Sequence, residues 1–219
     1  MVNGRTIAIG DVHGCLDAFQ AVLAAIEPRS EDTIVMLGDY VDRGPNSRGV
    51  LQELLDLGTW CRLVPLLGNH DEMFLDVCTG RDEYRDSWLM YGGDATEASY
   101  GMVPEAVPRE HVDLLVACRL WFETDTHLFV HANYHSDRPL EGQPPGILCW
   151  ESIRDRVPKP HVNGKTAIVG HTSQKSGEVL DLGYLKCIDT YCYGDGRLTA
   201  MDVETGQLWQ ADKQGRMRG

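Results

Sequence analysis

Five short blocks of this chain carry carboxylate, imidazole and amide side chains that could bind metal ions or transfer protons. In chain order they are residues 10–14 (Gly-Asp-Val-His-Gly), 38–44 (Gly-Asp-Tyr-Val-Asp-Arg-Gly), 68–71 (Gly-Asn-His-Asp), His131 and 170–172 (Gly-His-Thr). Asp11 and His13 stand two positions apart after an apolar run, so both side chains leave an extended segment on the same side. Aspartate oxygens and histidine nitrogens suit Mn²⁺, Fe²⁺/³⁺ or Zn²⁺. The joint pattern predicts a site for two metal ions.

Taken one at a time, the blocks also fit ordinary structural roles. Asp39 could cap the helix that follows it, His131 could be a histidine of the core, and Asn69 could be a turn residue. Asp42 and Arg43 could form a surface ion pair of little energetic value. These roles do not explain why all five blocks follow predicted strands and together supply the ligand types of one site.

A predicted βαβαβ unit positions the first three blocks. Residues 5–9, 32–37 and 61–67 are short apolar runs that predict strands. Between them, residues 16–26 and 45–58 carry apolar side chains at helical spacing. Strands joined by helices in this way run parallel, and ligands collect at the carboxyl ends of parallel strands. The sequence therefore predicts an α/β fold with its site at those ends.

The rest of the chain predicts a helical middle followed by more strands. Residues 69–120 are mostly of helical type, with an interruption at Gly92-Gly93. Further strands are predicted at residues 120–123, 127–130 and 166–169, and an antiparallel meander at 178–181, 184–189, 197–202 and 207–210. We expect a single domain over residues 1–219, in which a helical insert at about 80–118 and a surface loop at about 132–149 determine which substrate binds.

Composition narrows the class of protein. The formal net charge of −13 and the absence of a basic stripe argue against a nucleic-acid partner. The seven cysteines are odd in number and form no C-x-x-C pair, which favours free thiols in a reducing compartment. No stretch reaches 18 apolar residues and the first residues lead directly into a strand, so we expect no membrane association. The expectation is a cytoplasmic enzyme, with a monomer favoured.

The five blocks resemble those of the calcineurin-like metallophosphoesterases. Within that group, the series is most similar to the bacterial and phage-type Ser/Thr protein phosphatases of the phosphoprotein phosphatase family. The resemblance covers about residues 5–210. It implies a central β-sandwich of two mixed sheets flanked by helices, with a dinuclear metal site at the strand carboxyl ends.

Two divalent metal ions are the cofactors that the resemblance implies, with Mn²⁺ favoured and Fe or Zn as alternatives. One carboxylate must then be shared by both ions. The implied ligands are Asp11, His13 and Asp39 for the first ion, and Asp39, Asn69, His131 and His171 for the second. Such a pair of ions can hold a bridging hydroxide that attacks a phosphoryl group in line.

The resemblance also assigns catalytic and phosphate-binding residues. His70 is implied as the general acid for the leaving group, with Asp42 orienting its imidazole. Arg43 is expected to bind the phosphate oxygens through its planar guanidinium, with Asn69 beside it. Arg154, four residues after Trp150, is our choice for a second phosphate-binding arginine, and Arg156 stays open as the alternative.

Three functions compete. The main hypothesis is a phosphatase for phosphoserine and phosphothreonine proteins, with phosphotyrosine as a further substrate; residues 91–96 and the compact length favour it. The first alternative is a symmetrical dinucleoside tetraphosphate hydrolase, which would need base-stacking residues near the site. The second is an inactive phosphate-binding regulatory domain, which would lack a ligand or the acid pair. Tyr191 could also reach the site.

Overall fold

A computed structural model describes residues 4–101 and 105–219, and its first half alternates strands and helices as the apolar pattern predicts. These elements are β1 (Thr6–Ile9), α1 (Leu16–Ile26), β2 (Thr33–Met36), α2 (Ser47–Leu57) and β3 (Arg62–Pro65). Strands β1, β2 and β3 pair in parallel, in the order expected for a βαβαβ unit. Residues 102–104 of the predicted insert lie outside the described part, and the single-domain assignment stays a prediction.

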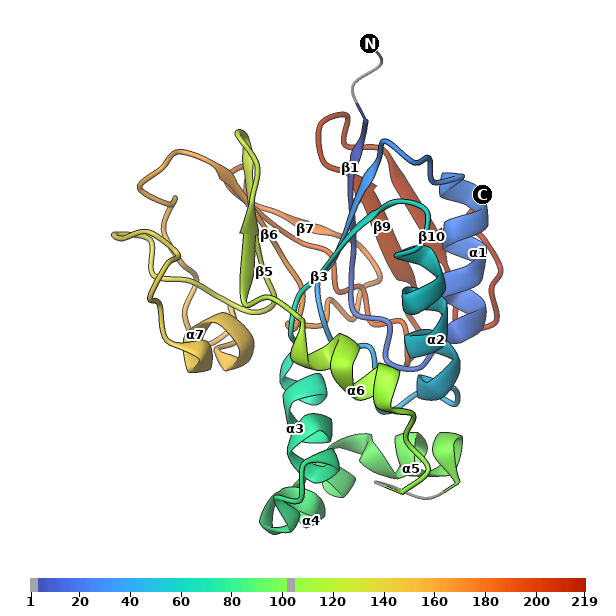
Figure 1. Cartoon of the computed structure of the whole chain (residues 1–219). Coiled ribbons are helices and arrows are strands. Elements are labelled where there is room, and N and C mark those ends of the chain that lie inside the picture. The colour runs from blue at the N-terminus through green and yellow to red at the C-terminus, as the bar shows by residue number, and fades with distance from the viewer. Residues whose placement is uncertain (1–3, 102–104) are drawn as a thin grey trace.

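A group of helices follows β3 and lies at the carboxyl ends of the strands (Figure 1). Its elements are α3 (Asn69–Cys78), η1 (Asp82–Tyr84), α4 (Arg85–Trp88), η2 (Leu89–Gly93), α5 (Asp94–Tyr100) and α6 (Arg109–Val116). The predicted interruption at Gly92-Gly93 is a kink between two helices in η2, where Gly92 has a non-helical φ of 106°. Glycine adopts such a positive φ at little cost because it has no Cβ.

The second half of the chain supplies all five strands of the second sheet and two strands of the first. It contains β4 (Trp121–Glu123), β5 (His127–Val130), α7 (Pro145–Trp150), β6 (Thr166–Val169), β7 (Leu180–Asp181), β8 (Leu185–Cys187), β9 (Leu198–Asp202) and β10 (Leu208–Ala211). The sheets have the orders β10-β9-β1-β2-β3 and β4-β5-β6-β8-β7, and both mix parallel with antiparallel pairs. This confirms the predicted sandwich of two mixed sheets.

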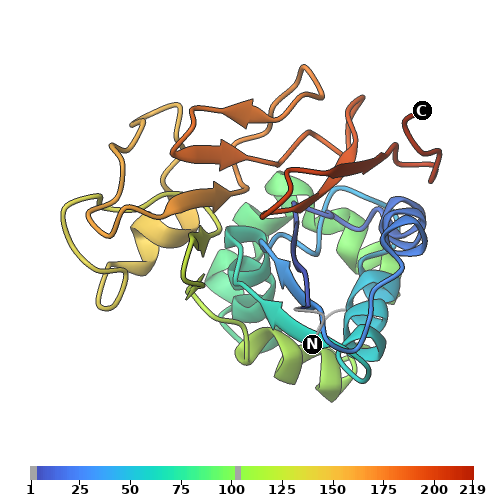
Figure 2. The ribbon, with the colours of Figure 1, turned by 90° about the horizontal axis from the view of Figure 1, so that it is seen from above.

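Alternation of side chains along the strands explains the layers. In β1, Ile7 and Ile9 pack with helices α1 and α2, whereas Ala8 points to the other side. Ala8, Val35 and Leu66 meet Phe129 and Ile168 of the second sheet in the layer between the sheets. Figure 2 shows α1 and α2 on the far side of the first sheet and α7 beyond the second.

Two expectations about the second half are wrong. The four last strands do not form one meander, because β7 and β8 join the second sheet while β9 and β10 join the first. The hairpin turns between the paired strands were visible in the sequence, but the change of sheet depends on distant partners. The expected surface loop at 132–149 also ends in a helix, α7, which begins at Pro145, a favoured first helical residue.

Candidate metal centre and active site

The six residues implied as metal ligands meet where strands from both sheets end. Asp11 and His13 follow β1, and Asp39 follows β2. Asn69 is the first residue of α3, which begins shortly after β3. His131 and His171 follow β5 and β6 in the second sheet. The site therefore lies between the two sheets, at the edge that the parallel strands predict.

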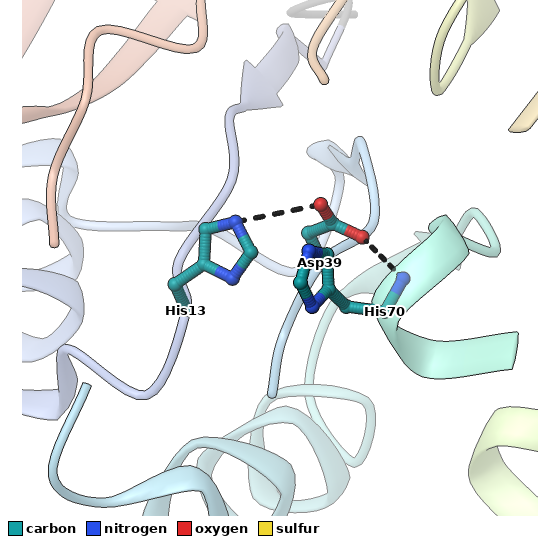
Figure 3. A group of neighbouring side chains, drawn as sticks. All are labelled: His13, Asp39 and His70. Carbon is teal, nitrogen blue, oxygen red and sulfur yellow. Dashed lines mark hydrogen bonds and ion pairs between the residues drawn. The ribbon is translucent and has the colours of Figure 1, made fainter. Parts of the chain in front are cut away.

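Asp39 is at the centre of this group. Its Oδ2 lies 3.4 Å from Nε2 of His13, and its Oδ1 lies 3.5 Å from Nε2 of His131. Figure 3 shows the carboxylate between the ring of His13 and the backbone nitrogen of His70, which donates to Oδ1 at 3.0 Å. A carboxylate with imidazoles on both sides has the geometry that a shared ligand needs.

Backbone carbonyls orient two of the imidazoles. Nδ1 of His13 donates to the carbonyl of Val41 at 2.9 Å, and Nδ1 of His131 donates to that of Leu37 at 2.7 Å. In both rings this leaves Nε2 as the acceptor atom, facing Asp39. Hydrogen bonds of this kind fix the tautomer of metal-binding histidines.

Asn69 connects the two histidines of the second sheet. Its side-chain Oδ1 lies 3.2 Å from Nε2 of His131 and 2.9 Å from Nδ1 of His171. The two imidazole rings are themselves 5.1 Å apart. One amide oxygen and two imidazole nitrogens thus converge with Asp39 on a second candidate position.

The carboxylate of Asp11 has a buried oxygen that could bind a cation. Its Oδ2 accepts the backbone amide of His171 at 2.9 Å, but Oδ1 is buried and has no hydrogen-bond partner among the described residues. A buried carboxylate oxygen without a partner is costly unless an ion binds it. The backbone passes so close that a Cβ at Gly170 would lie 2.2 Å from Oδ1. Glycine at position 170 is therefore required.

The protonation states also suit metal binding. Burial lowers the pKa of His13 well below its usual value, and burial followed by the charge of His131 lowers that of His171 to about 4. Both rings are thus neutral near pH 7, the form that binds metals. Burial alone would raise the pKa of Asp39, but the surrounding histidines, His131 first, hold it below its usual value.

Two groups of potential ligand atoms stand out within the described residues. One comprises His13, Asp39 and His70, and the other Asp39, His131 and His171, with the ligand atoms of each group within 4.8 Å of one another. These groups and the partnerless Asp11 oxygen fit two divalent ions that share Asp39. His70 is thus close to the first position, although we expect it to act as an acid.

The expected acid pair is present and buried. Nδ1 of His70 lies 2.7 Å from Oδ2 of Asp42. The same carboxylate accepts the indole Nε1 of Trp88 at 2.9 Å and the hydroxyl of Thr96 at 2.8 Å. Burial still leaves the pKa of Asp42 raised, although all three hydrogen bonds lower it. Trp88 and Thr96 belong to the helical insert, so this region supports the expected acid pair through contacts that the sequence did not reveal.

Asp71 organises the backbone of the site. Its carboxylate accepts the amides of Asp39 at 2.7 Å, Tyr40 at 2.9 Å and Gly68 at 3.0 Å. It therefore joins the loop after β2 to the start of α3.

Arg43 reaches the centre, with a tyrosine behind it. Its NH1 lies 2.9 Å from Nε2 of His13, and its guanidinium stacks over the ring of Tyr193 at 4.4 Å. Tyr193 also makes an edge contact with His13 at 4.9 Å. Tyr191, which the sequence suggested, packs edge-on against Tyr193. The tyrosine in contact with the expected ligands is thus two residues further along.

The structure separates the two candidates for the second arginine. Arg154 donates to the backbone carbonyl of Ser173, two residues after His171. Arg156 is engaged by Glu151 and by the carbonyl of Tyr134. Arg154 therefore lies beside the loop that carries His171, whereas Arg156 is held in an ion pair. The role of Arg154 in phosphate binding stays a prediction.

Backbone strain is concentrated at the site. Outside glycine, positive φ angles occur among the described residues at seven positions: His13, Glu27, Asp39, Asp42, Arg43, His171 and Tyr191. Five of these are the site residues introduced above. Such angles are uncommon for residues with a Cβ, and they gather at sites that the surrounding structure holds in place.

A cavity of about 260 Å³ opens at the candidate site. Its walls include Arg43, Asn69, His70 and His171, and also the aromatic side chains of Tyr91 and Trp150. A phosphate group in this cavity would meet the arginine, the acid and two expected ligands together. The aromatic walls are the feature that the dinucleotide hypothesis required.

Comparison with known proteins places the chain in a family. The model of the calcineurin-like phosphoesterases matches residues 4–195. A symmetrical bis(5'-nucleosyl)-tetraphosphatase of Acidovorax ebreus is 46% identical over an alignment of 130 residues. The match covers 47% of this chain and 46% of that protein. One from Klebsiella pneumoniae is 50% identical over 76 residues, 34% of this chain and 26% of that protein. The matched segments thus span less than half of these relatives.

Solved structures share the fold over almost the whole chain. A crystal structure described as a candidate diadenosine tetraphosphatase has a TM-score of 0.73 at 22% identity and covers 96% of this chain and 94% of its own. A cold-active protein-tyrosine phosphatase from a Shewanella species has a TM-score of 0.67 at 19% identity, covering 98% and 80%. Together with the family match and the metal-ligand geometry, this makes the chain a member of the calcineurin-like phosphoesterases.

Proposed function

We propose that this metallophosphoesterase hydrolyses dinucleoside tetraphosphates symmetrically, adding water across the central anhydride to release two nucleoside diphosphates. The observation that carries the proposal is the 46% identity, over 130 residues, to a protein named for this activity. The aromatic walls of the 260 Å³ cavity agree with it. The sequence had favoured a protein phosphatase, and these observations favour its alternative.

The described residues have separable roles in such a reaction. When bound, two divalent ions would polarise the phosphoryl oxygens and supply an activated water. Arg43 would bind the non-bridging oxygens of the phosphate next to that position. His70, held by Asp42, points a proton donor toward the leaving oxygen. Asn69, His131 and His171 would hold the remaining ligand position from the second sheet.

A second candidate function is phosphomonoester hydrolysis on phosphoserine or phosphothreonine. The specific observation in its favour is the buried His70–Asp42 pair with its 2.7 Å contact. A serine alkoxide is a strong base and must be protonated as it leaves, whereas a nucleoside diphosphate is a far weaker base. An acid held this firmly is of most use to a poor leaving group.

One experiment separates the two functions. The protein would be treated with EDTA, restored with Mn²⁺, Mg²⁺, Zn²⁺ or Fe²⁺, and assayed on diadenosine tetraphosphate and on phosphoserine and phosphotyrosine peptides. We expect kcat/KM for the dinucleotide to exceed that for the peptides by more than tenfold (roughly 1.4 kcal/mol of transition-state binding), with ADP as the single product. A preference for the peptides, or formation of ATP and AMP, would overturn the proposal.

A further inference from the structure

Two large aromatic side chains are exposed at the entrance of the catalytic cavity. Tyr91 is 57% exposed and Trp150 is 41% exposed. Both line the same cavity as Arg43 and His70. Tyr91 comes from the helical insert and Trp150 from the end of α7, so the rings approach the cavity from different elements. Exposed apolar surface beside a polar site indicates a binding function.

Trp150 is fixed in place although its ring is accessible. Its indole Nε1 donates to Oε2 of Glu72 at 2.6 Å. Glu72 belongs to α3, so this hydrogen bond ties the orientation of the ring to that helix. A ring that is held rigidly loses little conformational entropy when a ligand stacks on it.

Tyr91 is tied to the phosphate-binding arginine through its neighbour. The carbonyl of Gly92 accepts the backbone amide of Arg43 at 3.0 Å, at the kink in η2. The fit is close, because a Cβ at Gly92 would lie 2.8 Å from Cγ of Arg43. The insert thus places the backbone next to Tyr91 against the residue expected to bind phosphate.

We propose that Tyr91 and Trp150 form a stacking subsite for one nucleobase of the substrate. This inference rests on the proposed function, which supplies a substrate with a base at each end. Aromatic side chains stack on any base because every base has a π face. The cavity of about 260 Å³ is smaller than the usual range of roughly 300–1,000 Å³ for sites that enclose a drug-sized ligand. We therefore expect the cavity to take one half of the dinucleotide, with the other half outside.

The test measures binding, so that it does not depend on turnover. Dissociation constants of ADP, phosphotyrosine and inorganic pyrophosphate would be measured by calorimetry on the full chain loaded with Mn²⁺. The variants are Tyr91→Leu and Trp150→Leu, with Tyr91→Phe and Trp150→Phe as the conservative pair. Trp60→Leu is the control, because Trp60 is also exposed, at 58%, but lines a separate cavity beside α1 and α2.

We expect the wild-type protein to bind ADP at least fivefold more tightly than pyrophosphate, since base stacking contributes about 1–3 kcal/mol per base. Each leucine variant should lose this preference while its affinity for pyrophosphate stays within twofold. The phenylalanine variants and Trp60→Leu should keep it. Thermal unfolding of every variant identifies those that are misfolded, and Tyr91→Leu, at an exposed position, keeps the test valid if Trp150→Leu fails to fold.

The other outcomes are also decisive. Equal affinity of the wild type for ADP and pyrophosphate would overturn the subsite. Tight binding of phosphotyrosine, without a preference for ADP, would assign the rings to a peptide side chain and likewise overturn it. A clear preference for ADP with no hydrolysis of diadenosine tetraphosphate would retain the subsite and reject the proposed function.

Discussion

The expected metal centre and the rim of the cavity beside it are built in opposite ways. The metal centre, called the floor below, consists of the six expected ligands Asp11, His13, Asp39, Asn69, His131 and His171, of which Asn69 and His171 also line the cavity. The rim consists of Tyr91 and Trp150. All floor residues except His171 are buried, and they follow regular strands of both sheets. The rim residues are exposed and belong to an insert and to a short helix.

This contrast separates a region that must keep a fixed geometry from one that can change with the substrate. Metal ligands must keep a fixed geometry, and strand ends packed on both faces supply it. The substrate beyond the phosphate varies, and loops and inserts can change without disturbing the sheets. We therefore expect substitutions in the floor to abolish chemistry and substitutions in the rim to alter which substrate binds.

The largest effect should follow from Asp39→Asn. This change removes the carboxylate that both ion positions share, so we expect metal content to fall well below two ions per chain and activity to fall to background. Metal content would be measured by mass spectrometry after dialysis. Asp17→Asn, at an exposed position of α1, is the matched control. An Asp39→Asn protein that keeps two ions would remove Asp39 from its bridging role.

His70→Asn should separate the acid from the ligands. We expect kcat for a phosphoserine peptide to fall by about 10²–10⁴-fold, the usual range for a general acid, while two ions stay bound. The loss on diadenosine tetraphosphate should be smaller, because its leaving group, a nucleoside diphosphate, is a far weaker base and depends less on the proton. His135→Asn, in the loop after β5, is the control. Loss of metal in His70→Asn would place His70 among the ligands, next to His13 and Asp39.

The pH dependence of stability tests whether the histidines of the floor are buried in neutral form. Since the pKa of His171 is lowered to about 4 from a usual value near 6.5, the unfolded chain binds the extra proton first as the pH falls. The free energy of unfolding of the metal-free protein should therefore decrease between pH 6.5 and 4, by up to about 3 kcal/mol from this group.

Urea denaturation in EDTA across this range would measure the decrease. The slope of the unfolding free energy against pH measures how many protons are taken up on unfolding. In His171→Gln this number should be smaller by up to one than in the wild type, whereas His135→Gln should follow the wild type. Identical slopes in wild type and His171→Gln would show that His171 titrates normally in the folded protein.

Tyr193 lies between the floor and the rim and should give the smallest effect. Tyr193→Leu removes the ring beneath the guanidinium of Arg43, and we expect KM to rise about two- to fivefold with little change in kcat. Tyr193→Phe keeps the ring and should behave as the wild type, as should Tyr191→Leu. A fall in kcat with unchanged KM would instead give Tyr193 a part in orienting His13.

The sequence predicted which residues come together in the floor. It did not predict the side chains that hold the neighbouring Asp42 in place. Asp11, His13 and Asp39 are recognisable because each follows an apolar strand at short range. Trp88 and Thr96, in contrast, lie 46 and 54 residues from the Asp42 carboxylate that they bind. No local pattern marks such a contact, because it depends on how the insert folds back over the strand ends.

The strand pattern had a similar limit. The turns that join β7 to β8 and β9 to β10 were visible from their glycines, but not the sheet that each hairpin joins. That choice depends on pairing of β8 with β6, an earlier strand close by in the chain, and of β9 with β1, which lies near the opposite end of the chain. Tyr193 was missed for the same reason, since its contact with Arg43 depends on where the loop before β9 is placed.

The left-handed backbone at His13, Asp39, Asp42, Arg43 and His171 implies how this protein should fail under stress. Each such residue costs on the order of 1 kcal/mol, and a whole domain is stable by only about 5–15 kcal/mol. These conformations persist only while the surrounding layers are fully packed. Mild heating, or a distant substitution that loosens the core, should therefore relax these loops first. Activity would then be lost at temperatures where the two sheets are still folded.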